Sequence, residues 1–188
     1  MRTPGKSKKL LPKVRQRKTA VSLPEAIYPD LENELEVEIF RLFPPKASPP
    51  KKFFAREVPW GESEELLSER LLMGKRWTEV SAEALEEAIQ NSGLIFISRE
   101  AFAYYLPAMM VHALRAERSS FLIEPFDYQL DVRKNVETVR GVAHALSREQ
   151  YNLVRRVIKR LKGRFDDRFH KFKWLTWEDA RELPSNQA

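Results

Sequence analysis

The segment from Arg99 to Ala116 constrains the fold most, because it is the most apolar of the helical segments in the sequence. Ser98 precedes the segment and has the side-chain type preferred at a helix N-cap. Large apolar side chains are mostly buried in folded proteins, so we expect the most apolar helix to be the central core helix. Its structural centre comprises the bulky residues in the middle of the segment: Phe102, Tyr104, Tyr105, Leu106 and Pro107.

Pro107 lies inside this predicted helix. Proline has no backbone N–H, and its ring clashes with the carbonyl oxygen four residues earlier, so one backbone hydrogen bond is lost. The sequence therefore predicts a Pro-kinked central helix, with a kink or a break near residues 103–106.

Three segments before the central helix also carry apolar residues at helical spacing. Residues 30–43 have Asp30 as a candidate N-cap and a glutamate-rich outer face. Residues 62–73 end before Gly74, and residues 81–91 begin with a serine that can cap the helix. We expect each segment to be a helix with one buried face.

The closing helix has the clearest start signal. Residues 147–162 open with a capping box at Ser147, and Gly163 is expected to end the helix. Residues 132–145 are expected to be only partly helical because a glycine lies inside them, and residues 121–129 to be irregular because of a central proline. Together these patterns predict a mainly α protein, a single compact domain of about five helices.

Three regions of the chain differ in composition. Residues 1–24 mix Lys, Arg, Pro, Gly, Ser and Thr with few apolar side chains, which predicts a flexible basic arm. Residues 25–180 are expected to form the helical domain, and residues 181–188 a C-terminal tail. The domain ends with large apolar side chains that we expect to pack back on the core: Phe165, Phe169, Phe172, Trp174, Leu175 and Trp177.

The net charge of +6 hides a blocked distribution of charge. Residues 1–19 carry eight Lys or Arg and no acid, whereas residues 20–40 carry six acids and no base. Residues 62–87 hold eight acids against three bases, and residues 148–173 hold ten bases against three acids. Such blocks either attract anionic partners or complement each other within the molecule, and the sequence leaves both possibilities open.

Several classes of chemistry are excluded or unsupported. The chain has no cysteine, which rules out disulfides, cysteine-ligated zinc, iron–sulfur clusters and thiol catalysis for this chain acting alone. It contains no P-loop, nucleophile elbow, zinc-protease motif or dinucleotide-binding loop. His112, His144 and His170 are not at the spacing of helical metal ligands. We therefore expect no metal and no cofactor.

The sequence also bears on location. It has no run of about 18 apolar residues, and its basic N-terminus lacks the apolar region of a secretory signal. We expect no membrane span and a cytoplasmic location. Nothing in the sequence indicates an oligomeric state.

One polar cluster deserves weighing as a catalytic site. Three polar residues could lie near one face of the central helix: Glu100, Tyr104 and His112. A cleft at that face would make them a candidate catalytic site. The alternative is a glutamate at a helix N-terminus above an aromatic core, with His112 packed or hydrogen-bonded in that core. We favour the structural interpretation, because no nucleophile or orienting partner is identifiable nearby.

Two basic surfaces are candidates for binding a polyanion: the N-terminal arm and one face of the closing helix. Exposed cations neutralise phosphates and release counterions, which gives affinity without sequence recognition. The alternatives are a solubilising or tethered tail for the arm and a solvated face for the helix. The candidate residues are Lys6, Lys8, Lys9, Lys13, Arg15, Arg17, Lys18, Arg155, Arg156, Lys159 and Arg160.

Four parts of the sequence together carry a resemblance to a known family. They are Trp77, Leu85, the stretch Phe96–Ala108 with its pattern EAFxYYLPA, and Leu146–Gln150. These parts resemble an uncharacterised family of small bacterial proteins, a domain of unknown function, over about residues 38–162. The basic arm and the aromatic C-terminal segment would then be additions to the family unit. The resemblance implies a fold unit centred on the Tyr-Tyr-Leu-Pro segment and supplies no catalytic residue.

The function predicted from these observations is that of a non-enzymatic binding or accessory protein. It would engage a polyanion, either nucleic acid or a nucleoprotein, or an acidic protein, through the arm and the basic helix face. The competing hypothesis is a protein–protein interaction module, an adaptor or immunity-like inhibitor, that uses the acidic helices and the aromatics Phe53, Phe54 and Trp60. An enzyme built on the Glu100 cluster is the third and least supported possibility.

Overall fold

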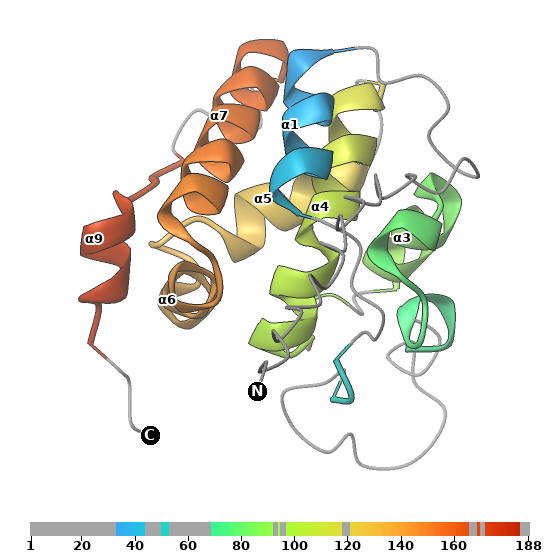
Figure 1. Ribbon diagram of the computed structural model, residues 1–188, viewed down its shortest axis with the longest axis horizontal. Coiled ribbons are helices and arrows are strands. Elements are labelled where there is room, and N and C mark those ends of the chain that lie inside the picture. The colour runs from blue at the N-terminus through green and yellow to red at the C-terminus, as the bar shows by residue number, and fades with distance from the viewer. Residues whose placement is uncertain are drawn as a thin grey trace, which may run out of the picture.

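The computed structural model describes residues 33–43, 50–52, 69–91, 94, 97–117, 121–165, 169 and 172–184. Helices account for all regular elements of these residues, and no β-strand occurs among them, so the predicted mainly α fold is confirmed (Figure 1). In chain order the elements are α1 (Glu34–Leu42), η1 (Trp77–Glu79), α3 (Ala82–Gln90), α4 (Arg99–Arg115), η3 (Phe121–Ile123), α5 (Glu124–Gln129), α6 (Val136–Ala145), α7 (Arg148–Arg164) and α9 (Trp177–Arg181).

Helix α4 is the central core helix, as its sequence predicts. Ser98 caps it, with its Oγ accepting a hydrogen bond from the Ala101 amide at 3.1 Å. Thirteen of its 17 residues are buried. The helix continues through Pro107, so the predicted alternative of a break is wrong; the kink itself stays a prediction. A proline in a buried helix loses one hydrogen bond, and the packing of its apolar neighbours offsets that loss.

The predicted structural centre lies in the core. Phe102, Tyr105 and Leu106 are fully buried, and Tyr104 is half-buried. Tyr105 donates a hydrogen bond from Oη to the Leu72 carbonyl oxygen at 2.5 Å, which ties α4 to the end of the helical residues 69–72. Burial raises the pKa of Tyr105, so the hydroxyl stays protonated as this donor. Gly74 follows at a φ of 80°, a left-handed conformation that suits the predicted helix stop.

Helices α1, α6 and α7 and the turn η1 pack around α4. Figure 1 shows α1 and α7 running side by side along α4. Helix α6 approaches α4 closely at Gly141, where a Cβ atom would lie 2.5 Å from Cδ of Arg99. Because of Gly141, residues 132–145 were expected to be only partly helical. In the structure the same glycine allows α6 to pack closely against Arg99 of α4. Apart from Ala84 and Ala103, the buried hydrophobic residues of the described chain, from Ile39 to Ala180, belong to one cluster.

Helix α1 differs from its prediction in two respects. Its N-cap is Asn33 rather than Asp30, with the Asn33 side chain accepting from the Glu36 amide at 3.1 Å. Its glutamate-rich face is not wholly outward, because Glu36 is fully buried. Arg115 holds the Glu36 carboxylate in a two-point ion pair, with contacts of 3.0 and 2.7 Å. The acidic pattern alone gave no sign of this pair, since the partners are 79 residues apart.

In the C-terminal half, some of the helix boundaries predicted from the sequence are confirmed and others are wrong. The capping box at Ser147 is confirmed in both directions, but α7 runs two residues past the predicted end at Lys162, through Gly163. Pro125, taken as a sign of irregular structure, lies instead in the first turn of α5, where a missing N–H has no cost. The short helix α9, capped by Thr176, was not predicted, because five residues carry too little periodicity.

The aromatic C-terminal segment packs against the core, as expected. Phe165 and Phe169 are buried. The other large apolar residues of the segment are partly buried against the core: Phe172, Trp174, Leu175 and Trp177.

The Glu36–Arg115 pair yields a stability prediction. Replacing Arg115 by Ala leaves a fully buried carboxylate without its charged partner, which should lower the free energy of unfolding by about 3 kcal/mol. The matched control is Lys134→Ala, which removes an exposed pair with Asp127 and should cost less than about 1 kcal/mol. Urea denaturation of both variants measures the difference, and equal losses would contradict the buried-pair account.

Candidate functional site

The pattern of buried and exposed residues along α7 explains why one of its faces is strongly basic. Six residues of the helix are buried, and they include Tyr151, Val154, Ile158 and Leu161, the apolar series read from the sequence. The capping box and this apolar stripe set the rotation of the helix, so the positions between them point outward. The four predicted binding residues of the helix are all exposed: Arg155, Arg156, Lys159 and Arg160.

A surface groove of about 520 Å³ lies along this face, and we call it the α7 groove. Its volume is within the range of ligand-binding sites. Of its described lining residues, four are cations, two are aromatic and none is a carboxylate. The lining residues are Asn152, Arg155, Arg156, Ile158, Lys159, Lys162, Phe172 and Trp174.

The basic surface continues beyond the groove. A second hollow of about 350 Å³ shares Arg156 and Lys159 with the α7 groove and adds Arg160, Gly163 and Arg164. Arg164 is already engaged, because it donates to the carbonyl oxygens of Leu114 at 2.5 Å and Ala116 at 2.9 Å at the C-terminus of α4. The positive guanidinium is also stabilised by the negative end of the α4 helix dipole. Arg164 therefore has a structural role.

The cations of the α7 groove differ in whether a carboxylate neutralises them. Arg156 forms an ion pair with Glu38 of α1, with one contact of 3.1 Å. Arg155, Lys159 and Lys162 form no ion pair within the described part of the chain, and neither does Arg160 in the second hollow. Four cations of this basic face therefore have no carboxylate partner among the described residues.

The Arg156–Glu38 pair also bears on the blocked distribution of charge. Helix α1, which holds part of the acidic block, lies beside the basic helix α7 (Figure 1). The two blocks thus complement each other within the molecule at this contact. Among the described residues the complement is partial, because Arg155, Lys159 and Lys162 of the groove form no ion pair with α1.

Two members of the predicted polar cluster meet at a second pocket, of about 290 Å³. Glu100 and Tyr104 line it together with Trp77. Tyr104 Oη and Trp77 Nε1 are buried and make no hydrogen bond within the described residues. Burial raises the pKa of Tyr104, and the nearby Trp77 backbone amide, outside hydrogen-bonding geometry, lowers it by less. Glu100 lines the same pocket, but no hydrogen bond joins it to Tyr104 among the described residues, so the two are not paired as an acid and its base in this structure.

His112 does not join this pocket. It lies eight residues from Tyr104 on the same helix, about 12 Å along the axis. Its Nε2 is 2.8 Å from the Val80 carbonyl oxygen, which can only accept, so Nε2 carries the proton. The side chain is 9% exposed. The structure places His112 as a hydrogen-bonded core residue, the interpretation favoured from the sequence.

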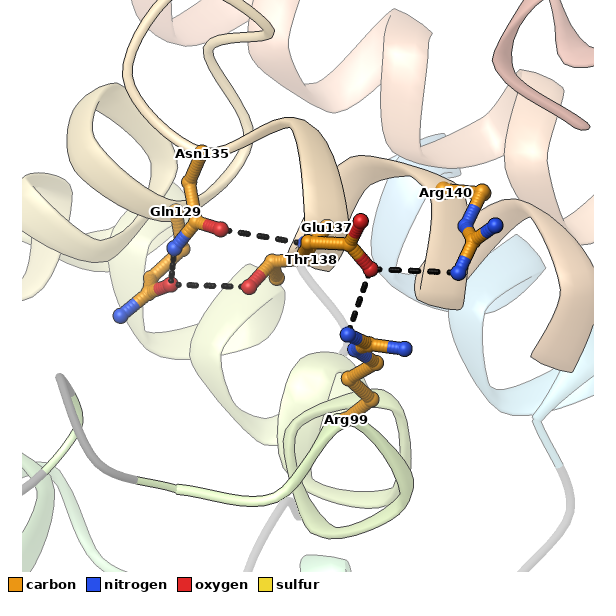
Figure 2. Close-up of polar contacts among 6 residues, drawn as sticks. All are labelled: Arg99, Gln129, Asn135, Glu137, Thr138 and Arg140. Atoms are coloured by element: carbon orange, nitrogen blue, oxygen red, sulfur yellow. Dashed lines mark hydrogen bonds and ion pairs between the residues drawn. The ribbon is translucent and has the colours of Figure 1, made fainter. Parts of the chain in front are cut away.

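A further polar cluster joins α4, α5 and α6 (Figure 2). Glu137 accepts from Arg99 at 2.5 Å and from Arg140 at 3.2 Å. Beside it, Gln129 Oε1 accepts from Asn135 at 2.7 Å and from Thr138 at 3.2 Å, while Asn135 caps α6. These groups point toward one another, as the dashed contacts in Figure 2 show, so the cluster fixes the start of α6.

A third hollow, of about 500 Å³, lies between the end of α3 and α5. Two exposed aromatic side chains line it, Phe121 at 42% and Tyr128 at 46% exposure. Its described lining includes Glu124 and no cation, which distinguishes it from the described lining of the α7 groove.

Several predicted residues lie outside the described part of the chain. They include the whole basic arm, with Lys6, Lys8, Lys9, Lys13, Arg15, Arg17 and Lys18, and the aromatics Phe53, Phe54 and Trp60, as well as His170. Among the described residues, no three His, Asp or Glu side chains gather in a way that would hold a metal ion. None of the described helices has the length and apolar character needed to span a bilayer.

The groove residues that sequence reasoning missed are Phe172 and Trp174. Both were expected to pack on the core, which they do in part, but their remaining surface lines the groove. The signal was the alternation Lys171-Phe172-Lys173-Trp174, in which aromatics alternate with cations next to a basic helix.

These observations describe a helical protein with a surface groove of cations and aromatic rings. Residues 59–182 match the model of a family described as Family of unknown function (DUF6714). The match spans more than half of the chain, so the protein belongs to that family, and the predicted resemblance to an uncharacterised family is confirmed. The matched region includes the aromatic C-terminal segment, which corrects the expectation that this segment is an addition. No curated protein and no solved structure matches the chain.

The placement of His112 gives a pH prediction. Burial lowers the pKa of His112 below its ordinary value of 6.5, and the Val80 contact opposes this only in part. The unfolded chain therefore binds a proton here more readily than the folded one, so the neutral side chain contributes stability above about pH 6.5 that is lost as pH falls. The difference in unfolding free energy between wild type and His112→Gln should shrink from about pH 8 to pH 5.5, measured by urea denaturation. His144→Gln, at an exposed position, is the control; a constant difference for His112→Gln would contradict the buried neutral state.

Proposed function

We propose that this protein is a non-enzymatic binding protein that engages a polyanion, nucleic acid or a nucleoprotein, through its basic arm and the basic face of α7. The observation that carries the proposal is the α7 groove, where three cations without ion pairs in the described chain line one surface and none of the described lining residues is a carboxylate. A ligand with regularly spaced negative charges would neutralise these cations and release bound counterions.

The positions of the cations suit an extended ligand. Arg155, Lys159 and Lys162 follow one another at spacings of four and three residues, so they form a row along one side of the helix. The row spans about 10 Å at the helical rise of 1.5 Å per residue. Successive phosphates of a nucleic acid strand fit such a row better than a single compact anion does.

The affinity expected from this surface is modest and strongly dependent on salt. Four phosphate contacts, from these cations and Arg160, give a slope of about −3 for the logarithm of affinity against the logarithm of salt concentration with single strands. A fourfold rise in salt then weakens binding by about 50-fold. The arm, with eight further cations in residues 1–19, would add to this slope.

The competing hypothesis, a protein–protein interaction module, differs from the proposal in its response to salt. Its predicted aromatic surface lies outside the described residues. A partner held by apolar contacts is retained at high salt, whereas a polyanion is released.

The test is binding of labelled oligonucleotides across a salt series, beginning near 50 mM. Arg155→Gln combined with Lys159→Gln should weaken binding and reduce the salt slope by about 1.4, because two contacts are lost. A variant lacking residues 1–19 should reduce the slope further.

The matched control is Lys51→Gln combined with Arg70→Gln, which removes the same charge from exposed positions outside the groove. This control should bind nearly as wild type does. Absence of binding at 50 mM salt, or an equal loss in both double variants, would refute the proposal; a loss seen only without the arm would refute the role of α7.

A further inference from the structure

Three aromatic rings form a ladder that leads from the core into the α7 groove. Tyr151 is fully buried, and its ring stacks on that of Trp174 with centroids 4.7 Å apart and planes at 28°. Trp174 in turn lies nearly parallel to Phe172, at 6.3 Å and 18°. Both Trp174 and Phe172 are half-buried and line the groove. The groove therefore presents ring surface that the fold does not cover.

The ladder is held in place before any ligand binds. Tyr151 Oη donates to the Leu175 carbonyl oxygen at 3.4 Å, and the Lys173 carbonyl oxygen accepts from the Val132 amide at 3.3 Å. Phe169 packs edge-on against Phe172 at 5.6 Å. The buried Trp174 Nε1 makes no hydrogen bond among the described residues, so ring packing sets the position of its indole. A surface fixed in this way needs little ordering on binding.

Rings and cations at one groove select among polyanions. A duplex offers phosphates, but its bases are stacked inside and have no free faces for a protein ring. A polysaccharide sulfate or polyphosphate offers charge and no flat ring. A single strand offers both, because its bases can stack on aromatic side chains while its phosphates follow a basic groove.

We propose that the α7 groove binds single-stranded nucleic acid, with a base stacked on the Phe172–Trp174 end of the ladder and the neighbouring phosphates held by Arg155, Lys159 and Lys162. This inference rests on the proposed polyanion function and names the ligand of that same site. Stacking accepts any base, since every base has a flat face, so the groove discriminates strandedness rather than sequence.

The experiment compares three ligands of about 12 nucleotides on the full chain: oligothymidylate, its duplex with oligoadenylate, and an abasic strand with the same number of phosphates. Oligothymidylate should bind at least about five-fold more tightly than the abasic strand, as loss of one stacked base predicts, and more tightly than the duplex. Oligothymidylate should also quench tryptophan fluorescence, and the quench should be reduced in Trp174→Phe, which keeps an aromatic ring at that position.

Phe172→Leu tests the ladder directly. It should weaken oligothymidylate binding at least about five-fold without changing the salt slope, because leucine removes the ring and no charge. Phe121→Leu is the matched control, since Phe121 is an exposed aromatic in the hollow between α3 and α5. The ligand comparison and the fluorescence quench need no destabilising variant, so they decide the question even where Phe172→Leu fails to fold.

The outcomes separate this inference from the proposed function. Equal affinity for oligothymidylate and the abasic strand, or unchanged binding by folded Phe172→Leu, overturns the single-strand assignment; salt-sensitive binding that Arg155→Gln with Lys159→Gln weakens would leave the polyanion proposal standing. No binding of any of the three ligands near 50 mM salt overturns both.

Discussion

The structure depends on the need to bury α4 on all of its sides. A helix with one apolar stripe can rest on a single neighbour, but 13 of the 17 residues of α4 are buried, so several elements must surround it. Helices α1, α6 and α7 and the turn η1 meet that need, since all of them contact α4 and contain buried apolar side chains. Two polar contacts add to this packing: Arg115 of α4 binds Glu36 of α1, and Tyr105 of α4 donates to Leu72 at the end of the helical residues 69–72.

This constraint also determines where the candidate site lies. Because α7 turns its apolar stripe toward α4, its cations are left on the opposite side, where Arg155 and Lys159 line the groove. The aromatic segment after α7 packs back on the same core, and that packing brings Phe172 and Trp174 beside those cations. The position of the groove thus follows from the packing of α7 and of the C-terminal aromatic segment on the same core.

Local chemistry made much of this fold predictable from sequence. The caps at Ser81, Ser98 and Ser147 and the stop at Gly74 depend on neighbouring residues, and all four are found as expected. What the sequence did not reveal depends on contacts between distant residues. Glu36 is indistinguishable from its exposed neighbours until Arg115 faces it, and Phe172 looks like a core residue until α7 places cations at its edge. The exposed basic face of α7 was predicted; the groove was not, because it needs two elements.

The acidic helix α1 would limit how the proposed polyanion approaches α7. Glu38 pairs with Arg156 on the side of α7 that faces α1, and Glu34 is exposed on the same short helix. A strand passing along that side would meet carboxylates, whose repulsion offsets the attraction of the cations. On the other side of α7, the neighbouring side chains are the aromatic rings of Phe172 and Trp174. The Arg156–Glu38 pair therefore makes the two sides of one basic helix unequal, so the proposed ligand, held by Lys159 and Lys162, would be directed toward the aromatic ladder.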